Sequence, residues 1–427
     1  MNLHKKHFLL AGFIILLGLC SCSKKNEPLI IWTDRSDFAS FVELFNKEHE
    51  DVKAVLVYKP DSAENFPLKK KEQKPDIVIG TMLKNDRTKR YFCNINSLFK
   101  EEEKSDSKHL NTDIFYKNVL DYGKIKKNQY LVPINFNLPA MIFASSSGQY
   151  IPEDSPLEIS LDQVRDIASA INQKDKNSSY TAMGYAPSWN SEFLYTAAKI
   201  FGAKFKKNAL LFSYDQEALD SMTKFMRDWT LAYNTSSSME QDFSFKYLYT
   251  PVSKQVLSNK SLFAFTSSAE LFSLPEDQLN NLDFRWLGKD EIIPVEDKVL
   301  CLGIYRHSSN KSKAKNFLSW FFTEETQLRL LERNKELNLG TSGFGIAGGF
   351  SSIKIVNERM SQSYYNSLMG NIPDDKNLLM PEILPPLWDT LKIKVVLPYL
   401  LDSSNTDSFK DSASLEERIA NWEKLAY

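Results

Sequence analysis

Apolar runs alternate with amphipathic helical patterns in the first part of the chain. Residues 29–32, 52–58 and 76–80 are compact and apolar, which is typical of buried strands. Between the first two runs, apolar side chains recur at helical spacing at Phe38, Phe41, Val42 and Phe45. Strand, helix, strand and strand in this order predict an α/β layer with a mostly parallel sheet.

Helical patterns dominate the rest of the chain. Before these helices, residues 130–143 contain two apolar segments around a polar, proline-flanked centre. We expect this centre to face a cleft. Ser160 is a suitable N-cap for the helix that follows it. Helices are predicted at 159–173, 192–201, 216–229, 314–322 and from Thr323, and strands at 180–186, 262–265 and 299–305.

The first 22 residues have the layout of a secretory signal. Lys5 and Lys6 precede an apolar run over residues 8–19, which is shorter than the roughly twenty residues that span a bilayer. The segment ends Leu19-Cys20-Ser21-Cys22, which resembles a bacterial lipobox. Cys22 is the expected lipid acceptor, because the register with Cys20 places bulky Leu19 before the cut. An ordinary cleaved signal is the remaining alternative.

Composition describes an ordinary globular chain after this signal. A mature length of about 400 residues predicts two domains. The 53 basic and 54 acidic residues give a net charge of −1, so nothing favours nucleic acid as a partner. Cys93 and Cys301 are too few for a cysteine-rich metal site, and either one disulfide or two free thiols fits them. We expect no metal and no cofactor.

Several segments together resemble the extracellular solute-binding proteins of ABC transporters, in the family that contains maltodextrin- and glycerol-phosphate-binding proteins. Residues 29–45 resemble the opening strand and helix of that family, residues 74–78 (KPDIV) its "PDI" strand, and residues 133–143 its crossing segment. The run FFTEETQ, residues 321–327, is the most specific match. Two departures are Phe143-Ala144-Ser145-Ser146 in place of "Y-N-K", and Asn259-Lys260-Ser261 in place of a glycine.

The resemblance implies a two-lobed α/β periplasmic-binding-protein fold, with a ligand cleft between lobes joined by crossing strands. After the signal (1–21) and a tether (22–28), we expect lobe 1 at 29–143 plus 290–345 and lobe 2 at 144–289 plus 346–427. It also implies a monomeric receptor that serves an ABC permease. The lipid on Cys22 then holds it on the periplasmic side of the cell membrane without a spanning helix.

A sugar needs aromatic platforms beside amides and carboxylates, and this chain offers both. Trp189 and Trp388 resemble the ring-stacking positions of the family, and Asn190 and Glu192 share the Trp189 loop. Core packing is the alternative for each tryptophan. The candidate ligand-binding residues are Trp32, Asp34, Arg35, Asn135, Asn137, Trp189, Asn190, Glu192, Ser342 and Trp388.

The remaining candidates also have ordinary structural alternatives. Asn135 and Asn137 suit either hydroxyl recognition or turns and caps, and Arg35 either an anion or the surface. Ser342 lies in a glycine-rich stretch, residues 340–349, that spells G-x-G-x-x-G. No strand of a first βαβ unit precedes it, so we reject a dinucleotide site and expect a hinge or a loop close to ligand.

A carbohydrate receptor is therefore the leading hypothesis for function. The alternatives are a receptor for glycerol phosphate or a glycerophosphodiester, and a structural or adhesive surface lipoprotein. Enzyme activity finds little support, because His49, His109 and His307 lack metal-ligand spacing and no nucleophile elbow occurs. A glycosidase needs a pair of carboxyl groups, and a chain with 54 acidic residues can provide such a pair. Composition therefore leaves a glycosidase open.

Overall fold

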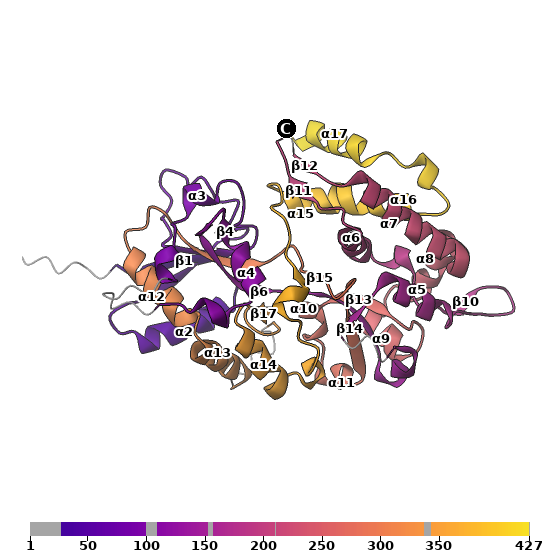
Figure 1. Cartoon of the computed structure of the whole chain (residues 1–427), viewed down its shortest axis with the longest axis horizontal. Coiled ribbons are helices and arrows are strands. Elements are labelled where there is room, and N and C mark those ends of the chain that lie inside the picture. The colour runs from indigo at the N-terminus through magenta and orange to yellow at the C-terminus, as the bar shows by residue number, and fades with distance from the viewer. Residues whose placement is uncertain (1–26, 100–108, 153–156, 210, 337–342, 427) are drawn as a thin grey trace, which may run out of the picture.

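The computed structural model describes residues 27–99, 109–152, 157–209, 211–336 and 343–426, which fold into two lobes (Figure 1). The signal, Cys22, most of the tether and Ser342 lie outside these ranges. No helix within the described part of the chain is long and apolar enough to cross a lipid bilayer.

A six-stranded sheet forms the centre of the first lobe. Its order is β17-β6-β16-β3-β1-β2, and the three predicted strands β1, β2 and β3 are parallel. Strand β16 runs antiparallel to both of its neighbours. The strands are β1 (Leu29–Thr33), β2 (Ala54–Tyr58), β3 (Ile77–Gly80), β6 (Leu131–Phe136), β16 (Leu300–Ile304) and β17 (Phe350–Ser351).

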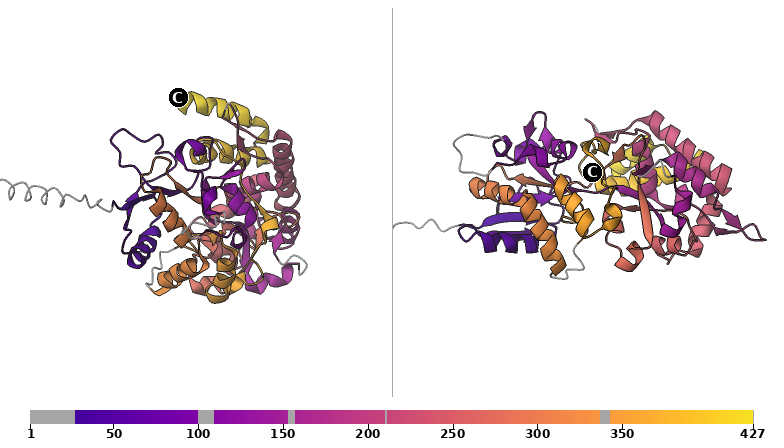
Figure 2. Two further views of the ribbon diagram at one scale, coloured as in Figure 1. Left: turned by 60° about the vertical axis from the view of Figure 1, so that its left-hand side comes forward. Right: turned by 60° about the horizontal axis from the view of Figure 1, so that its bottom comes forward.

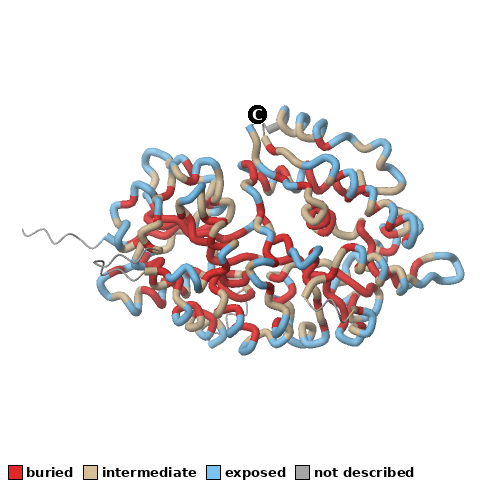
Figure 3. Tube along the Cα trace, in the orientation of Figure 1, coloured by how far each residue is buried: buried red, intermediate tan, exposed pale blue. Residues whose placement is uncertain are grey.

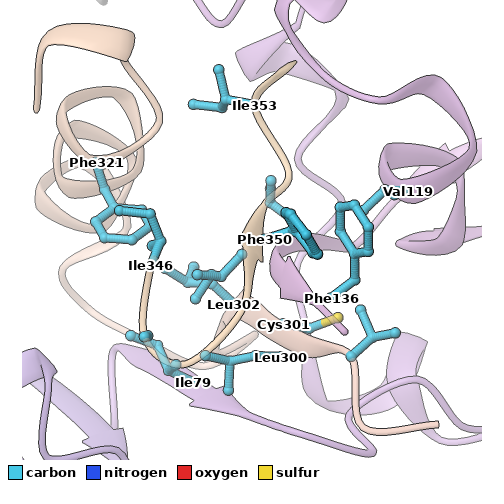
Figure 4. Packing of buried hydrophobic residues seen from close by; sticks show 14 of the residues in the cluster. Ile79, Val119, Phe136, Leu300, Cys301, Leu302, Phe321, Ile346, Phe350 and Ile353 are labelled. Carbon is cyan, nitrogen blue, oxygen red and sulfur yellow. The ribbon is translucent and has the colours of Figure 1, made fainter. Parts of the chain in front are cut away.

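Aromatic side chains join the helices of this lobe. The rings of Phe38 and Phe321 lie 5.6 Å apart, and those of Phe45 and Phe317 lie 5.0 Å apart, so the first helix packs on a helix near residue 317. Figure 4 shows Phe136 beside Phe350, whose rings stack at 5.6 Å. The helices are α2 (Phe38–Glu48), α3 (Thr88–Tyr91), α4 (Lys117–Tyr122), α12 (Lys311–Phe321), α13 (Glu324–Glu336) and α14 (Lys354–Ser363).

A four-stranded sheet, β13-β7-β14-β8, separates the two hydrophobic cores. Alternate residues of β7 face opposite sides, so Ala140 and Ile142 join the first core while Met141 and Phe143 join the second. The strands are β7 (Pro139–Ala144), β8 (Glu158–Ile159), β13 (Ala264–Ser267) and β14 (Leu282–Leu287).

Helices make up most of the second lobe, as the sequence predicted. Ser160 caps α5 through a reciprocal pair with Gln163, which confirms the predicted N-cap. The predicted strand at 180–186 is shorter, Tyr180–Ala182. The helices are α5 (Leu161–Ser169), α6 (Ser191–Ile200), α7 (Gln216–Trp229), α8 (Ser237–Lys246), α9 (Val252–Leu257), α10 (Ser268–Leu271), α11 (Glu276–Leu279), α15 (Trp388–Leu391), α16 (Leu397–Ser404) and α17 (Leu415–Ala426).

Within the described ranges, four strand pairs lie outside the two main sheets. One of them, β15 with β18, is parallel and forms where the chain passes between the lobes. The pairs are β4 (Lys124–Ile125) with β5 (Asn128–Gln129), β9 (Gln173–Lys174) with β10 (Tyr180–Ala182), β11 (Lys206–Lys207) with β12 (Phe212–Ser213), and β15 (Ile293–Pro294) with β18 (Leu378–Leu379).

The C-terminal part of the chain is shared between the lobes, whereas we expected residues 346–427 in the second lobe. Strand β17 pairs with β6 of the first sheet, and Ile346, Phe350 and Met360 belong to the first core. Only from about Leu384 onward do the side chains join the second core. The apolar residues after the glycine-rich stretch cover β6, which explains the difference.

Three connections cross between the lobes, at residues 137–138, 288–299 and 380–387. The right-hand view in Figure 2 shows the lobes side by side. Buried segments continue from the first sheet into these connections (Figure 3), where Leu138, Pro294 and Val295 are buried. The predicted two-lobed fold with crossing strands is confirmed.

Candidate ligand-binding cleft

Two neighbouring cavities lie where the lobes meet. The first, the β3 cavity, has a volume of about 330 Å³. Its second-lobe wall consists of residues 384–389. Its first-lobe wall consists of Asp61, Ala63, Glu64, Phe66, Thr81, Met82, Asn85, Asp86, Arg87 and Tyr91. Parallel strands commonly place ligands outside their carboxyl ends, and the loops after β2 and β3 provide this wall.

The second cavity, the α6 cavity, has a volume of about 300 Å³. Its walls come from α6 along its length, the end of β13, the crossing residues Pro294, Glu296, Asp297 and Lys298, and Lys392. Asp389 lines both cavities, so the two are adjacent. Together they form the candidate cleft.

A glycine allows the two first-lobe loops to meet. A Cβ atom on Gly80, the last residue of β3, would lie 3.0 Å from the Cβ atom of Ser62 in the loop after β2. Glycine at this position therefore lets the wall of the β3 cavity close without a steric clash.

Asp297 is the centre of a buried polar network beside the α6 cavity. It accepts hydrogen bonds from the Tyr195 hydroxyl at 2.7 Å and the Trp388 Nε1 at 3.0 Å, and the Lys199 Nζ lies 3.0 Å away. The Lys392 Nζ is 3.8 Å from the same carboxylate. Burial raises the pKa of Asp297, but the two ammonium groups and the hydrogen bonds lower it to about 2. Asp297 is therefore a fixed anion at neutral pH.

Glu296 lines the same cavity but has a different environment. Among the described residues, its carboxyl group forms neither a hydrogen bond nor an ion pair. Burial raises its pKa to about 7, with Lys199 and Lys392 opposing and Glu270 and Asp297 adding to the rise. Adjacent carboxyl groups thus have opposite protonation tendencies.

Three of the predicted ligand residues line the cavities. Asn190 and Glu192 face the α6 cavity, and Trp388 faces the β3 cavity. Asn190 Oδ1 also caps α6 by accepting from the backbone N–H groups of Glu192 and Phe193 at 2.8 and 3.2 Å. Glu192 lies 2.7 Å from the Lys392 Nζ. Trp388 is buried, and its indole ring packs against Tyr195 and Phe205.

Arg35, Asn135 and Asn137 instead bind the glycine-rich loop, residues 343–349. The Asn135 amide donates to the carbonyl groups of Ile346 and Ala347 at 2.7 and 2.8 Å. The Asn137 amide donates to Gly348 O at 2.9 Å, and Arg35 donates to Ala347 O at 2.7 Å. These three residues line neither cavity, and their polar groups hold the loop against the first lobe.

Trp32, Asp34 and Trp189 also line neither cavity. Trp32 is fully buried in the first core. Trp189 is partly buried, donates to Glu240 O at 3.1 Å and stacks on Phe243 at 5.4 Å. Packing thus accounts for both tryptophans. Ser342 lies outside the described residues.

Sequence reasoning missed most of the residues that line the cleft. Thr81, Met82 and Asn85 directly follow a predicted parallel strand, and this position is a signal that points to them. Lys199, Asp297 and Lys392 come from three distant segments, so no local pattern links them. In the described part of the chain, no group of three metal-ligating side chains is suited to a metal ion. Cys93 and Cys301 are both free thiols.

Comparison with known proteins settles the class of this fold. A family model described as bacterial extracellular solute-binding protein matches residues 40–337. The chain belongs to this family. Its members bind small solutes rather than catalyse reactions, in agreement with the predicted absence of enzyme activity. No curated protein sequence matches the chain.

The fold of this family member is also found among solved structures. One of them, "CpMnBP1 with Mannotriose Bound", is 12% identical with a TM-score of 0.58. The alignment covers 92% of this chain and 98% of the other. At this level of identity the likeness establishes the shared two-lobed fold.

Proposed function

We propose that this solute-binding protein is the receptor of an ABC importer and binds a carbohydrate between its lobes. The carrying observation is the pair of adjacent cavities at the lobe junction, lined by both lobes and by rings beside hydrogen-bonding groups. Phe66 and Tyr91 line the β3 cavity with their rings 4.6 Å apart, and Tyr195 and Phe265 line the α6 cavity. Aromatic faces with a few polar groups suit a sugar ring.

The charges at the cleft argue against the phosphate alternative. Each lysine that lines the cavities already lies near a carboxylate, at 3.0 Å for Lys199, 2.8 Å for Lys298 and 2.7 Å for Lys392. A phosphate group needs cationic or N–H donors free to approach it. Among the described residues of the lining, the exposed Arg87 is the cation without an ion pair, and it lies in the β3 cavity rather than beside the lysines. A neutral or cationic ligand fits this lining better than glycerol phosphate.

The carbohydrate bound by "CpMnBP1 with Mannotriose Bound" also supports a saccharide ligand. The signal-like start and the Cys22 lipobox support a lipid anchor on the periplasmic side of the membrane. An anchored receptor stays close to the permease that receives its ligand. The adhesive-lipoprotein alternative predicts no affinity for small solutes.

Calorimetric titration tests this function. We expect binding heat with maltotriose or mannotriose and none with sn-glycerol 3-phosphate or a tripeptide. Tyr91→Ala is expected to lower saccharide affinity about 10-fold, because a ring platform is lost. Tyr58→Ala is the control, since Tyr58 is 72% exposed and lines neither cavity.

Two outcomes contradict the proposal. The absence of heat with any saccharide excludes a carbohydrate receptor. Tight binding of sn-glycerol 3-phosphate in the same titration favours the phosphate alternative. Radiolabelled palmitate incorporation checks the anchor, and labelling that survives Cys22→Ala contradicts the assignment to Cys22.

A further inference from the structure

The cleft contains more carboxyl groups than its own cations neutralise. Lysine pairs and the Asp86–Lys207 pair at 2.7 Å account for the other carboxyl groups of the lining. Four carboxyl groups form no ion pair with any residue that the structure describes: Asp61, Glu64, Glu270 and Glu296. The exposed Arg87 is the remaining cation of the lining without an ion pair. The unpaired charge is therefore acidic.

Glu296 is the group for which this excess matters most. Its side chain is partly buried, lines the α6 cavity and lacks a hydrogen-bonding partner in the described part of the chain. The Tyr195 hydroxyl and the Trp388 Nε1 donate to the neighbouring Asp297, and Lys199 forms an ion pair with it. These groups therefore do not pair with Glu296. Desolvation of a carboxyl group without a partner is costly, so a ligand that provides one gains affinity.

An ammonium group is the ligand feature that fits this position. It donates charge-assisted hydrogen bonds to a carboxylate, which are shorter and stronger than those of a neutral hydroxyl. Lys199 and Lys392 add positive potential at Glu296, whereas Glu270 and Asp297 add negative potential. The lining of the α6 cavity contains five carboxyl groups and three lysines, so carboxyl groups are in excess around it. An anionic ligand group meets repulsion here instead.

We propose that the α6 cavity binds the protonated amine of an amino-sugar saccharide, with Glu296 as its carboxylate partner. This inference rests on the proposed carbohydrate function and narrows its ligand class. The remaining sugar rings extend into the β3 cavity, beside Tyr91 and across Asp389, which lines both cavities.

Matched trisaccharides test the inference at pH 7. We expect a glucosamine trimer with free amines to bind at least 10-fold more tightly than its N-acetylated counterpart or mannotriose, because acetylation removes the charge. Glu296→Gln is expected to abolish that difference, because the amide carries no charge to pair with the ammonium group. Glu291→Gln is the control, since Glu291 is an exposed residue of the same connection that lines neither cavity.

Proton exchange gives a second readout that needs no variant. Glu296 faces Lys199 of α6, Lys392, Glu270 of α10 and its neighbour Asp297, and its pKa is about 7 in the free protein. An ammonium ligand lowers this pKa, so binding at pH 6.5 releases protons. A neutral sugar that accepts a hydrogen bond from protonated Glu296 takes protons up instead. Calorimetry in two buffers with different ionisation enthalpies distinguishes the two.

The outcomes separate this inference from the proposed function. Equal affinity for the free-amine and N-acetylated trimers, or proton uptake on binding the former, overturns the amine site and leaves a carbohydrate receptor. A preference for the free amine that persists in Glu296→Gln overturns the assignment to Glu296. If none of the saccharides binds, the carbohydrate function itself is wrong, and the inference falls with it.

Discussion

The residue type of a tryptophan in this chain does not tell whether its side chain lines the cleft or packs in the core. Trp388 lines the β3 cavity, and its Nε1 donates to Asp297, a residue that no sequence pattern picked out. Trp32 and Trp189 were also candidates, but Trp32 is buried in the first core and the partly buried Trp189 stacks on Phe243. Indole is large and apolar, so both roles attract it, and only the neighbours in space separate them.

Asp297 should contribute to the free energy of unfolding at neutral pH, and this contribution should be lost in acid. Its folded pKa of about 2 lies below the ordinary aspartate value of about 4, so its contribution is present above pH 4 and is lost as pH falls toward 2. The shift corresponds to about 2 kcal/mol in the free energy of unfolding. Asp297→Asn should therefore destabilise the protein at pH 7, with the difference from wild type shrinking between pH 4 and 2.

Urea unfolding at several pH values measures this effect. Asp228→Asn is a suitable control, because Asp228 pairs with Lys224 on the surface and its side chain is 60% exposed. Exposed pairs of this kind contribute less than about 1 kcal/mol. A destabilisation by Asp297→Asn that stays constant from pH 7 to 3 contradicts the assigned ionisation.

Glu296 should have the opposite effect on stability. Burial raises its folded pKa to about 7, above the ordinary glutamate value of about 4, and Glu270 and Asp297 contribute while Lys199 and Lys392 oppose. The protonated carboxyl group is favoured in the folded state, so this residue makes the protein more stable as pH falls from 7 toward 4. Glu296→Gln should remove that slope. Thermal unfolding at half-unit pH steps measures it, and an unchanged slope in the variant is the contrary result.

At the scale of elements, the order of strands and helices could be read from sequence, while the partners of the loops could not. Apolar runs and helical spacing are local properties, and they located β1, α2, β3, α5 and α12. The glycine-rich loop shows the limit. The sequence pattern predicted a hinge or a loop close to ligand, but the contacts of this loop with Arg35, Asn135 and Asn137 join residues more than 200 positions apart.

Gly345 should be needed for the shape of this loop. Its φ of +59° is unfavourable for other residues, and a Cβ atom there would lie 2.3 Å from the Gly349 carbonyl oxygen. Gly345→Ala should lower the free energy of unfolding by about 1–3 kcal/mol. Gly148→Ala is the control, because an added Cβ meets no atom within 4 Å. Equal unfolding midpoints for the two variants in urea would show that the loop tolerates the strain.

For the whole molecule, sequence indicated two lobes correctly but divided the C-terminal region differently. A strand of two residues, Phe350–Ser351, is too short to give a sequence pattern, yet it attaches residues after the glycine-rich loop to the first sheet. The contacts between the two lobes also could not be predicted from local sequence patterns. The ion pair between Asp86 of the first lobe and Lys207 of the second joins the loop after β3 to strand β11, and no local sequence pattern links these two segments.

This Asp86–Lys207 pair should act on the opening of the cleft. The Lys207 Nζ lies 2.7 Å from the Asp86 carboxylate, which lines the β3 cavity and is 53% exposed. Opening the lobes separates these charges, so the pair favours the closed arrangement over the open one. Lys207→Ala should therefore raise the ligand dissociation rate about 2- to 5-fold, as expected for a partly exposed pair, with little change in the association rate.

Stopped-flow measurement of saccharide release at low and high salt checks this role. The difference between wild type and Lys207→Ala should shrink at 1 M salt, because screening weakens the pair in the wild type. Lys224→Ala is the matched control, since Lys224 forms an exposed ion pair on α7, outside both cavities. A Lys207→Ala variant with wild-type release at low salt would mean that the cavity contacts alone hold the lobes around the ligand.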